Sequence, residues 1–548
     1  GGKSYLYDIA TALLDKAVVL TDGLVPEDEA QGALADWEHR GGAQGHKLSR
    51  ESRFPLSVFE QAFEVQLEKG EASQDTDRVR ILNSIACRDL YKEPLAEHPT
   101  YDAANSCLRW RFGMGFLHIA AELEVVDKYK LLELPEPAFI DGVKELYDRM
   151  YQAFFATAKY DLALAMSEKS LAIVLKTLGD EHPDVGKCYS NIAKVYQRQS
   201  KYSLALQHYE QSLAIGLKAL GEEHPDVGQS YYGIAFVYQR LSKYELALQH
   251  YEKSLAIRVK ALGHEHPSVG QSYYGMANVY ERQCKNDQAL LHHQKSLAIR
   301  LKALGSEHPD VGKGYNGMAI IYERQGKYDL ALEHYEKGLA IRLKALGGEH
   351  PDVGKSYHGM AIIYERQGKY DLALELYEKG LSLRLKALGE EHPDVGKSYY
   401  GMAVVFERQS KYDIASQYYE KSLAVRVKAL GNEHPDVGQS CYGIAHVHQM
   451  QSKYDLAIQN YERSLAVRLK ALGNEHPDVG QSYYGMASVL YSKGKYDLAL
   501  EHYEKGLTIR RKALGNEHPD VGQTYNGMAN VYVRQCKDDL AMQHYEEA

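Results

Sequence analysis

Apolar residues recur with helical spacing along most of the chain, and one copy of the pattern shows this most simply. In a segment that contains no proline, the apolar residues stand three or four positions apart, as on one face of an α-helix. These residues are Ala331, Tyr335, Leu339, Leu343 and Leu346. The pattern predicts a helix over Leu330–Leu346. Gly347 follows the last apolar residue, where a left-handed C-terminal cap favours glycine.

A second helix is predicted to begin at Pro351, because proline suits the first helical position and the residue before it is pushed out of helical geometry. Asp352 would then lie in the first turn, where the helix dipole favours an acid. The apolar face of this helix consists of Val353, Tyr357, Met360, Ala361 and Tyr364. The helix should end near Gln367-Gly368, so that the two segments form a helical hairpin.

This hairpin sequence returns every 42 residues, and a His-Pro pair marks each copy. The prolines are Pro183, Pro225, Pro267, Pro309, Pro351, Pro393, Pro435, Pro477 and Pro519. A fixed period of this length predicts a solenoid in which each hairpin buries its apolar stripe against its neighbours. Ala361, Ala373 and Gly380 are small in nearly every copy, as close helix packing requires.

The motif ALGxEHPDVG and the spacing resemble the 42-residue tetratricopeptide repeat of kinesin light chains. One copy places the family's signature residues at Tyr273, Met276, Ala277 and Tyr280, followed by the small Ala289 and Ser296. The resemblance covers 159–548 and implies nine repeats plus a truncated tenth. It also implies an all-α, right-handed superhelical solenoid that binds a protein or peptide on its concave surface.

The first 158 residues do not repeat. They are predicted to form a helical domain that caps the array. The expected helices are Ser4–Leu20, Glu27–Arg40, Pro55–Lys69, Asp75–Arg88, Tyr101–Arg111, Gly115–Leu134 and Ala138–Ala158. No helix sustains the heptads of a coiled coil, unlike the N-terminal region of kinesin light chains. This domain has 17 Lys+Arg and 27 Asp+Glu, a net charge of −10, whereas the array has 48 and 47.

Composition and motifs exclude several classes of function. The neutral array does not suggest nucleic-acid binding, and no apolar run is long enough for a membrane span. Histidines of neighbouring His-Pro pairs lie too far apart to share a metal ion. No catalytic or cofactor-binding motif is present. We therefore expect no enzyme activity, metal or cofactor. The six scattered cysteines suggest a reducing compartment, by default the cytoplasm.

The candidate binding residues lie on the helix that follows each His-Pro pair, on the face that lines the concave surface of tetratricopeptide arrays. Two positions carry mainly tyrosine and arginine, which are enriched at binding hot spots, and a third varies between apolar and polar residues. The predicted groove residues are Tyr232, Tyr274, Asn278, Arg282, Asn316, Arg324, His358, Arg366, Tyr400, Arg408, Tyr442, Tyr484 and Asn526. Arginine also binds carboxylates, so the partner is expected to be acidic in part.

Four alternatives remain open at this point, and one of them is an enzyme whose catalytic residues lie within residues 1–158, where no motif indicates them. Arginines such as Arg324 could pair with acids of the neighbouring hairpin and form only a solvated face. The array could serve as a structural spacer in a large assembly, with an unoccupied groove. The acidic N-terminal domain could lie against the arginines. In addition, glycine replaces the family's asparagine at one position of this face in eight copies, from Gly233 to Gly527, with only Asn191 retained. Glycine in mid-helix costs about 1 kcal/mol relative to alanine, which implies close approach to another group.

Overall fold

A computed structural model describes residues 17–20, 23–26 and 137–548. The chain divides into two compact units, Gly1–Ala153 and Phe154–Ala548. In the first unit the described parts are two short antiparallel strands, β1 (Ala17–Leu20) and β2 (Gly23–Pro26), and most of helix α8 (Pro137–Ala156). The second unit is the repeat array.

The strands correct one prediction and α8 confirms another. Residues 17–20 were expected to end the helix Ser4–Leu20, but they form β1. Val18, Val19 and Val25 are β-branched residues, which favour strands, and a two-residue connection suits a hairpin. The predicted helix Ala138–Ala158 corresponds to α8. The helices predicted between residues 27 and 134 lie outside the described residues.

In the array, every His-Pro pair starts a helix, as predicted. These His-Pro helices are α10 (Pro183–Arg198), α12 (Pro225–Arg240), α14 (Pro267–Arg282), α16 (Pro309–Arg324), α18 (Pro351–Arg366), α20 (Pro393–Arg408), α22 (Pro435–Met450), α24 (Pro477–Ser492) and α26 (Pro519–Arg534). The histidine before each helix is its N-cap. In α18 the Nδ1 atom of His350 accepts a hydrogen bond of 3.1 Å from the backbone N–H of Asp352.

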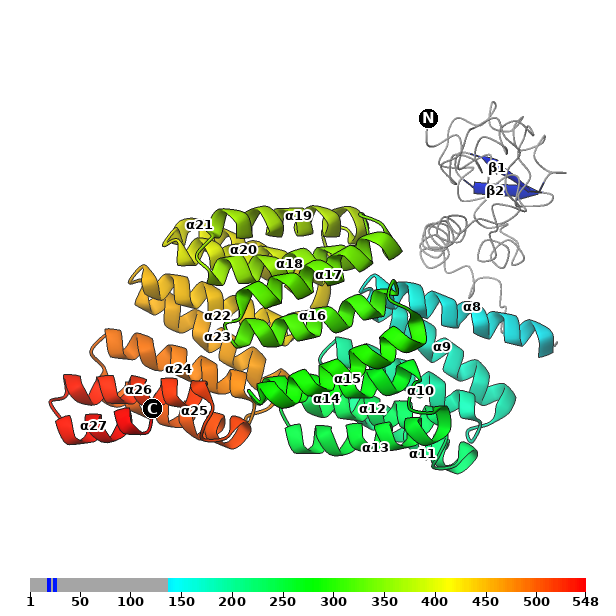
Figure 1. The fold of residues 1–548 in the computed structure, drawn as a ribbon, viewed down its shortest axis with the longest axis horizontal. Helices are drawn as coiled ribbons and strands as arrows, with labels where there is room; N and C mark the ends of the chain where they lie inside the picture. Colours follow the sequence, from blue (N-terminus) through cyan, green and yellow to red (C-terminus); the bar gives the residue numbers. More distant parts are fainter. Residues whose placement is uncertain (1–16, 21–22, 27–136) are drawn as a thin grey trace. The chain divides into compact units, whose positions relative to one another are not determined.

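The second set of helices begins at or just after the sequence Lys-Tyr in most copies. These Lys-Tyr helices are α9 (Tyr160–Leu178), α11 (Tyr202–Leu220), α13 (Tyr244–Leu262), α15 (Asn286–Leu304), α17 (Tyr328–Leu346), α19 (Tyr370–Leu388), α21 (Tyr412–Leu430), α23 (Tyr454–Leu472), α25 (Tyr496–Leu514) and α27 (Asp538–Glu546). Each His-Pro helix packs most extensively on the Lys-Tyr helix that follows it, so the hairpin consists of this pair and not of the predicted pair of a Lys-Tyr helix with the next His-Pro helix. The hairpins stack in chain order (Figure 1). The predicted all-α solenoid is therefore confirmed for the array.

The cap and the core differ from the prediction in two details. Gly347 has a positive φ of 79° but a ψ of 163°, so it adopts an extended conformation open mainly to glycine and not the left-handed helical cap. In α17, Ala331 and Tyr335 are buried as expected, but Leu343 is 39% exposed whereas Arg342 is only 3% exposed. The buried stripe of the Lys-Tyr helix therefore includes an arginine.

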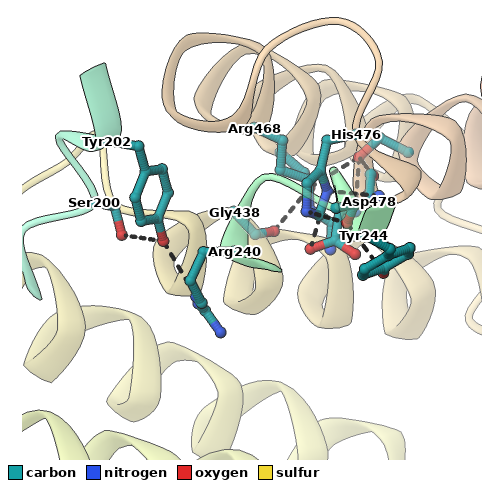
Figure 2. A network of polar contacts seen from close by, with 11 residues as sticks. Ser200, Tyr202, Arg240, Tyr244, Gly438, Arg468, His476 and Asp478 are labelled. Atoms are coloured by element: carbon teal, nitrogen blue, oxygen red, sulfur yellow. Dashed lines mark hydrogen bonds and ion pairs between the residues drawn. The ribbon is translucent and has the colours of Figure 1, made fainter. Parts of the chain in front are cut away.

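The array coils so tightly that its second superhelical turn contacts its first. Ser242 Oγ lies 3.1 Å from His476 Nε2, and Cys284 Sγ lies 3.4 Å from His518 Nε2. Both pairs are 234 residues apart, which is about 5.6 periods of 42 residues. Leu472 packs in one cluster with Tyr202 and Ile234 of the first turn. We call this contact between turns the seam, and Figure 2 shows part of it.

Candidate partner-binding surface

The His-Pro helices form the concave side of the array. Successive His-Pro helices, such as α10 and α12 or α16 and α18, contact each other directly, whereas successive Lys-Tyr helices do not come as close. A stack of hairpins curves toward the side on which its helices are closer together. The predicted groove residues, which all belong to His-Pro helices, therefore lie on the helices of the concave side.

The predicted tyrosine position forms a column, one residue per hairpin, which we call the tyrosine column. Its members are Tyr232, Tyr274, Asn316, His358, Tyr400, Tyr442, Tyr484 and Asn526. All are half-buried except Asn526, which is exposed. Tyr400 is representative: its ring meets the ring of Tyr419 edge-on at 5.1 Å, and the guanidinium of Arg426 lies 5.0 Å from its centroid. Each tyrosine ring is thus held from two sides.

The arginine beneath each tyrosine belongs to a buried arginine column that the sequence analysis missed. Its members are Arg258, Arg300, Arg342, Arg384, Arg426, Arg468 and Arg510. Arg426 Nη1 donates to the carbonyl oxygen of Asp436 at 2.8 Å and to Ser440 Oγ at 2.9 Å, both on the next His-Pro helix. The column therefore links each hairpin to the next. The sequence did contain a signal for this column, because an arginine recurs seven times at one position of the otherwise apolar stripe of the Lys-Tyr helices.

Burial sets the protonation of this surface. It raises the pKa of Tyr232 and of Tyr400 to about 12, so these phenols remain neutral donors. Burial also lowers the pKa of Arg258 to about 10, which still leaves the guanidinium charged near neutrality. The charged group beneath a neutral ring favours a cation–π contact. The rings are consequently rigid, partly exposed and uncharged.

The column members that are not tyrosine make other contacts. Asn316 lies between Gly312 and Arg342. With its amide oriented to satisfy both, it donates to the Gly312 oxygen at 3.2 Å and accepts from Arg342 Nη1 at 2.7 Å. His358 meets the Tyr377 ring edge-on, and burial, followed by the charge of Arg384, lowers its pKa to about 3. Asn278, at the neighbouring variable position, is half-buried.

The predicted arginines are exposed, but three of them are already paired. Arg324 contacts Glu281 at 2.9 Å, Arg366 contacts Glu323 at 2.8 Å, and Arg408 contacts Glu365 at 2.7 Å. Each acid belongs to the preceding hairpin, which is the pairing foreseen in the solvated-face alternative. Burial raises the pKa of Glu323 and of Glu365, although the arginines oppose this shift.

Arg282 differs from these three arginines, because the position that would supply its acid is Gln239. Arg282 instead contributes to lowering the pKa of Asp478, an acid of the second superhelical turn, together with other cations, of which Arg468 is the first. The predicted arginines therefore do not form one continuous cationic stripe for an acidic partner.

The glycine position does not line the groove. Gly233, Gly275 and the equivalent residues of later hairpins are buried. A Cβ atom on Gly275 would lie 2.5 Å from Cε1 of Tyr251, on the preceding Lys-Tyr helix. In the hairpin that has Asn191 in place of glycine, the residue facing it is Ser167 and not tyrosine. The glycines therefore accommodate a tyrosine ring, which was the close approach left unexplained by the sequence.

His293 is the exception within this row of packed tyrosines. It occupies the position of Tyr251 and Tyr335, it is fully buried, and neither ring nitrogen has a hydrogen-bond partner among the described residues. Burial is the first cause that lowers its pKa, to about 3. In equivalent hairpins the tyrosine reaches a side chain of the His-Pro helix, as Tyr419 does with Glu407 at 2.7 Å.

Replacing His293 with tyrosine is expected to stabilise the array by about 1–2 kcal/mol, because it removes two unsatisfied buried atoms and adds a hydrogen bond to Glu281. The difference in unfolding free energy between the variant and the wild type should grow as the pH falls below 6.5, the ordinary pKa of histidine. Unfolded wild-type chain then binds a proton that the folded chain resists, so wild-type stability is lost toward acid pH. Urea unfolding at several pH values measures this.

The control for this prediction is His292→Tyr. His292 Nδ1 is already bonded to the Gln288 oxygen at 2.8 Å, and Tyr418 occupies its position in another hairpin. That change should alter stability by less than about 0.5 kcal/mol. An equal gain in both variants would show that the unsatisfied nitrogens are not the cause.

Two absences concern only the part of the chain that the structure describes. No cluster of His, Cys, Asp or Glu there has the arrangement of a metal site. Among the described helices, none has the length and apolar character required to cross a membrane.

The fold and the concave surface define a repeat solenoid of the kind that presents side chains to another macromolecule. The profile of the tetratricopeptide repeat family matches residues 149–218, 226–302, 310–386, 357–428, 394–470, 436–512 and 478–548. The chain belongs to the tetratricopeptide repeat family, whose arrays are scaffolds for protein–protein interaction. No curated protein matches the chain.

Several solved structures are similar to parts of the chain. Nearly identical TPR-like repeats assigned to a kinesin light chain of Podosopora anserina are 30% identical, with a TM-score of 0.31, covering 38% of this chain and 98% of that one. BtubC from P. vanneervenii is 20% identical (TM-score 0.34; 44% and 93% covered). A Rap protein complexed with competence and sporulation factor is 15% identical (TM-score 0.46; 68% and 98% covered). The predicted likeness to kinesin-light-chain repeats agrees with the first of these.

Proposed function

We propose that the array is a binding scaffold that holds a partner protein or peptide on its concave surface, through the tyrosine column and the variable position beside it. The observation that carries this proposal is the rigid support of the rings. Tyr400, Tyr442 and Tyr484 each contact an edge-on ring and a buried guanidinium. Half-exposed rings that are already ordered lose little entropy when a partner binds.

The partner is expected to insert apolar side chains near the middle of this surface. The variable position there is occupied by Ile320, Ile362 and Val404, which are half-buried, and the neighbouring arginines already have carboxylate partners. An acidic partner would have to displace those acids. We therefore assign the central anchor to apolar contact and not to charge, with no catalytic step.

A triple variant of the central anchor tests this proposal, with residues that the chain itself uses at the same position. The changes are Ile320→Asn, Ile362→Asn and Val404→Ser, as in Asn278 and Ser488. Partners retained from native lysate of the source cells are identified by mass spectrometry, and the affinity of each is then measured by calorimetry. We expect at least about a tenfold loss of affinity from three apolar contacts.

The matched control removes apolar groups from the Lys-Tyr helices instead. Leu330, Leu372 and Ile414 are 42%, 46% and 38% exposed, and another hairpin has Gln288 at this position. Changing all three to glutamine should leave the affinity unchanged. If the control loses binding and the anchor variant retains it, the partner binds the Lys-Tyr side and the concave proposal is wrong.

A structural spacer is the second candidate function, and the seam favours it. Contacts between superhelical turns stiffen the array without any ligand. A spacer predicts that the anchor variant retains every partner, whereas changes at the edges of the array release them.

A further inference from the structure

The seam joins two different edges of the array, and every full repeat carries both. The turn edge consists of the end of each His-Pro helix, the turn residue with positive φ, and the start of the Lys-Tyr helix, for example Arg240, Ser242 and Tyr244. The loop edge consists of the loop between each Lys-Tyr helix and the next His-Pro helix, for example Leu472 and His476. In the seam, the turn edge of the first superhelical turn meets the loop edge of the second.

The seam is a specific polar interface with an apolar component. His476 contacts Ser242, which also accepts a hydrogen bond of 3.2 Å from the Tyr244 hydroxyl. Within the turn edge itself, one hairpin earlier, Tyr202 OH lies 3.1 Å from Ser200 Oγ and accepts from Arg240 Nε at 3.3 Å, so these contacts order the turn edge but do not cross the seam. Figure 2 labels His476 and Tyr244 of the first group and all three residues of the second. Leu514 packs against the cluster that contains Tyr244.

Charge is complementary across the seam. The pKa of Asp478 is lowered, against the effect of burial, first by Arg468 and then further by Arg282 and Arg240 of the opposite turn edge. The pKa of Glu475 is lowered first by its ion-pair partner Lys512 and also by Lys243 of the turn edge. The turn edge is thus cationic and the loop edge anionic where they meet.

The same edges are open at the two ends of the array. The loop-edge His224 side chain of the first turn is 38% exposed, whereas that of His476 in the seam is 10% exposed. On the turn edge, Ser200 is 6% exposed, but the equivalent Ser410 and Ser452 of the second turn are exposed.

The open edges also keep the charges and the thiol position of the seam. Lys411 and Lys453 are exposed on the open turn edge. Glu223 and Glu265 are exposed on the open loop edge, where they pair with Lys260 and Lys302 as Glu475 pairs with Lys512 inside the seam. Cys536 is exposed at the turn position that Cys284 occupies inside the seam. Each open edge therefore keeps the lysine, serine or glutamate that the other edge contacts within the chain, although Met450 and Ser492 stand where the seam has Arg240 and Arg282.

We propose that the open turn edge of the second superhelical turn binds the open loop edge of a second copy of this chain, so that the seam continues from one molecule to the next. We infer a second copy of this chain as the partner because the same two kinds of edge already contact each other in the seam. Because the two surfaces are different, the contact is heterologous, and repeated contacts of this kind extend in one direction instead of closing a dimer.

Charge reversal on the full chain tests the proposal. One protein carries Lys411→Glu with Lys453→Glu, and a second carries Glu223→Lys with Glu265→Lys. Sedimentation velocity over a concentration series should show wild-type association that weakens with added salt. Each double variant alone should have an apparent dissociation constant raised about tenfold, and an equimolar mixture of the two should recover association.

The matched control makes the same charge change away from both edges. Lys337 and Lys379 lie on the Lys-Tyr helices α17 and α19 and are about half exposed. Changing both to glutamate should leave association at the wild-type level. Thermal unfolding of every variant identifies any that fails to fold. A loss of association in this control equal to that of the edge variants would overturn the proposal.

A second experiment measures the solvent accessibility of the open turn edge. Maleimide labelling of Cys536, followed at the level of the peptide, should slow as the protein concentration rises, whereas buried Cys188 and Cys441 stay unlabelled throughout. Protection of Cys536 that is independent of concentration would mean that another part of the same chain covers this edge, and would overturn the proposal. A chain that stays monomeric at all concentrations, with Cys536 freely labelled, would overturn it as well.

Discussion

Changing Gly401 to alanine is expected to destabilise the array by about 3 kcal/mol, at the upper end of the usual cost of overpacking a core. A Cβ atom there would lie 2.5 Å from Cε1 and 2.6 Å from Cζ of Tyr377. Tyr377 is 2% exposed, so its ring has no space into which to move. Intrinsic helix propensity would favour alanine by about 1 kcal/mol, which makes the sign of the effect a strict test of the packing explanation.

The chain supplies both the control and the rescue for this change. Asn191 stands at the glycine position opposite Ser167, so Asn191→Ala should cost less than about 1 kcal/mol. In a double-mutant cycle, Gly401→Ala should be nearly neutral when Tyr377 is already serine. The coupling energy of the cycle should therefore be about 3 kcal/mol. Hydrogen exchange of α19 and α20 measures the effect locally, because unfolding of a solenoid need not be cooperative throughout. Equal costs with and without Tyr377→Ser would contradict the packing explanation.

The second large effect is expected at Arg426, where truncation and charge removal should give different results. Arg426 is 2% exposed and donates two hydrogen bonds to the next hairpin. Arg426→Ala should cost about 3 kcal/mol, because it removes charge-assisted hydrogen bonds and leaves a cavity beneath Tyr400. The Asp436 oxygen would keep its hydrogen bond from Ser440 Oγ at 3.4 Å, so no acceptor is orphaned.

Arg426→Met should cost less than about 1 kcal/mol, although it removes the same hydrogen bonds. No acidic side chain is hydrogen-bonded to the Arg426 guanidinium within the described residues, its Nε has no partner there, and burial lowers its pKa. A buried charge of this kind can be replaced by an apolar group of similar volume at little cost. Val174 stands at this position in an earlier hairpin. Urea unfolding and hydrogen exchange of α21 and α22 compare the variants. A methionine variant as unstable as the alanine variant would show that the charge itself stabilises the stack.

Local rules of sequence predicted the helices of the array because those helices begin and end for local reasons. Pro351 and Asp352 define a helix start, and His350 then becomes the cap of that start. Ala361 and Ala373, which are fully buried, could be identified from their small size in every copy. The surface positions of the tyrosine column followed from the same helical periodicity.

The parts that could not be predicted depend on contacts between different hairpins. Leu343 appeared to belong to the core because periodicity alone cannot show that the adjacent Arg342 finds polar groups on the next hairpin. The pairing of Arg366 and Arg408 with acids one hairpin away was one of two alternatives, and periodicity alone could not decide between them. The seam depends on a small rotation per hairpin that accumulates over 234 residues, and no local pattern encodes that angle.

The seam also bears on how such a gene can change its length. Its contacts connect one kind of edge to another at a constant offset, and both edges recur with the 42-residue period. Unequal recombination between near-identical repeats can remove or add a whole unit. Each loop of the seam then faces the turn between helices of the neighbouring repeat, where an equivalent residue makes the same contact. An insertion or deletion of any other length displaces every later contact at once. Selection on the seam should therefore preserve the repeat length strictly while leaving the number of repeats free to vary.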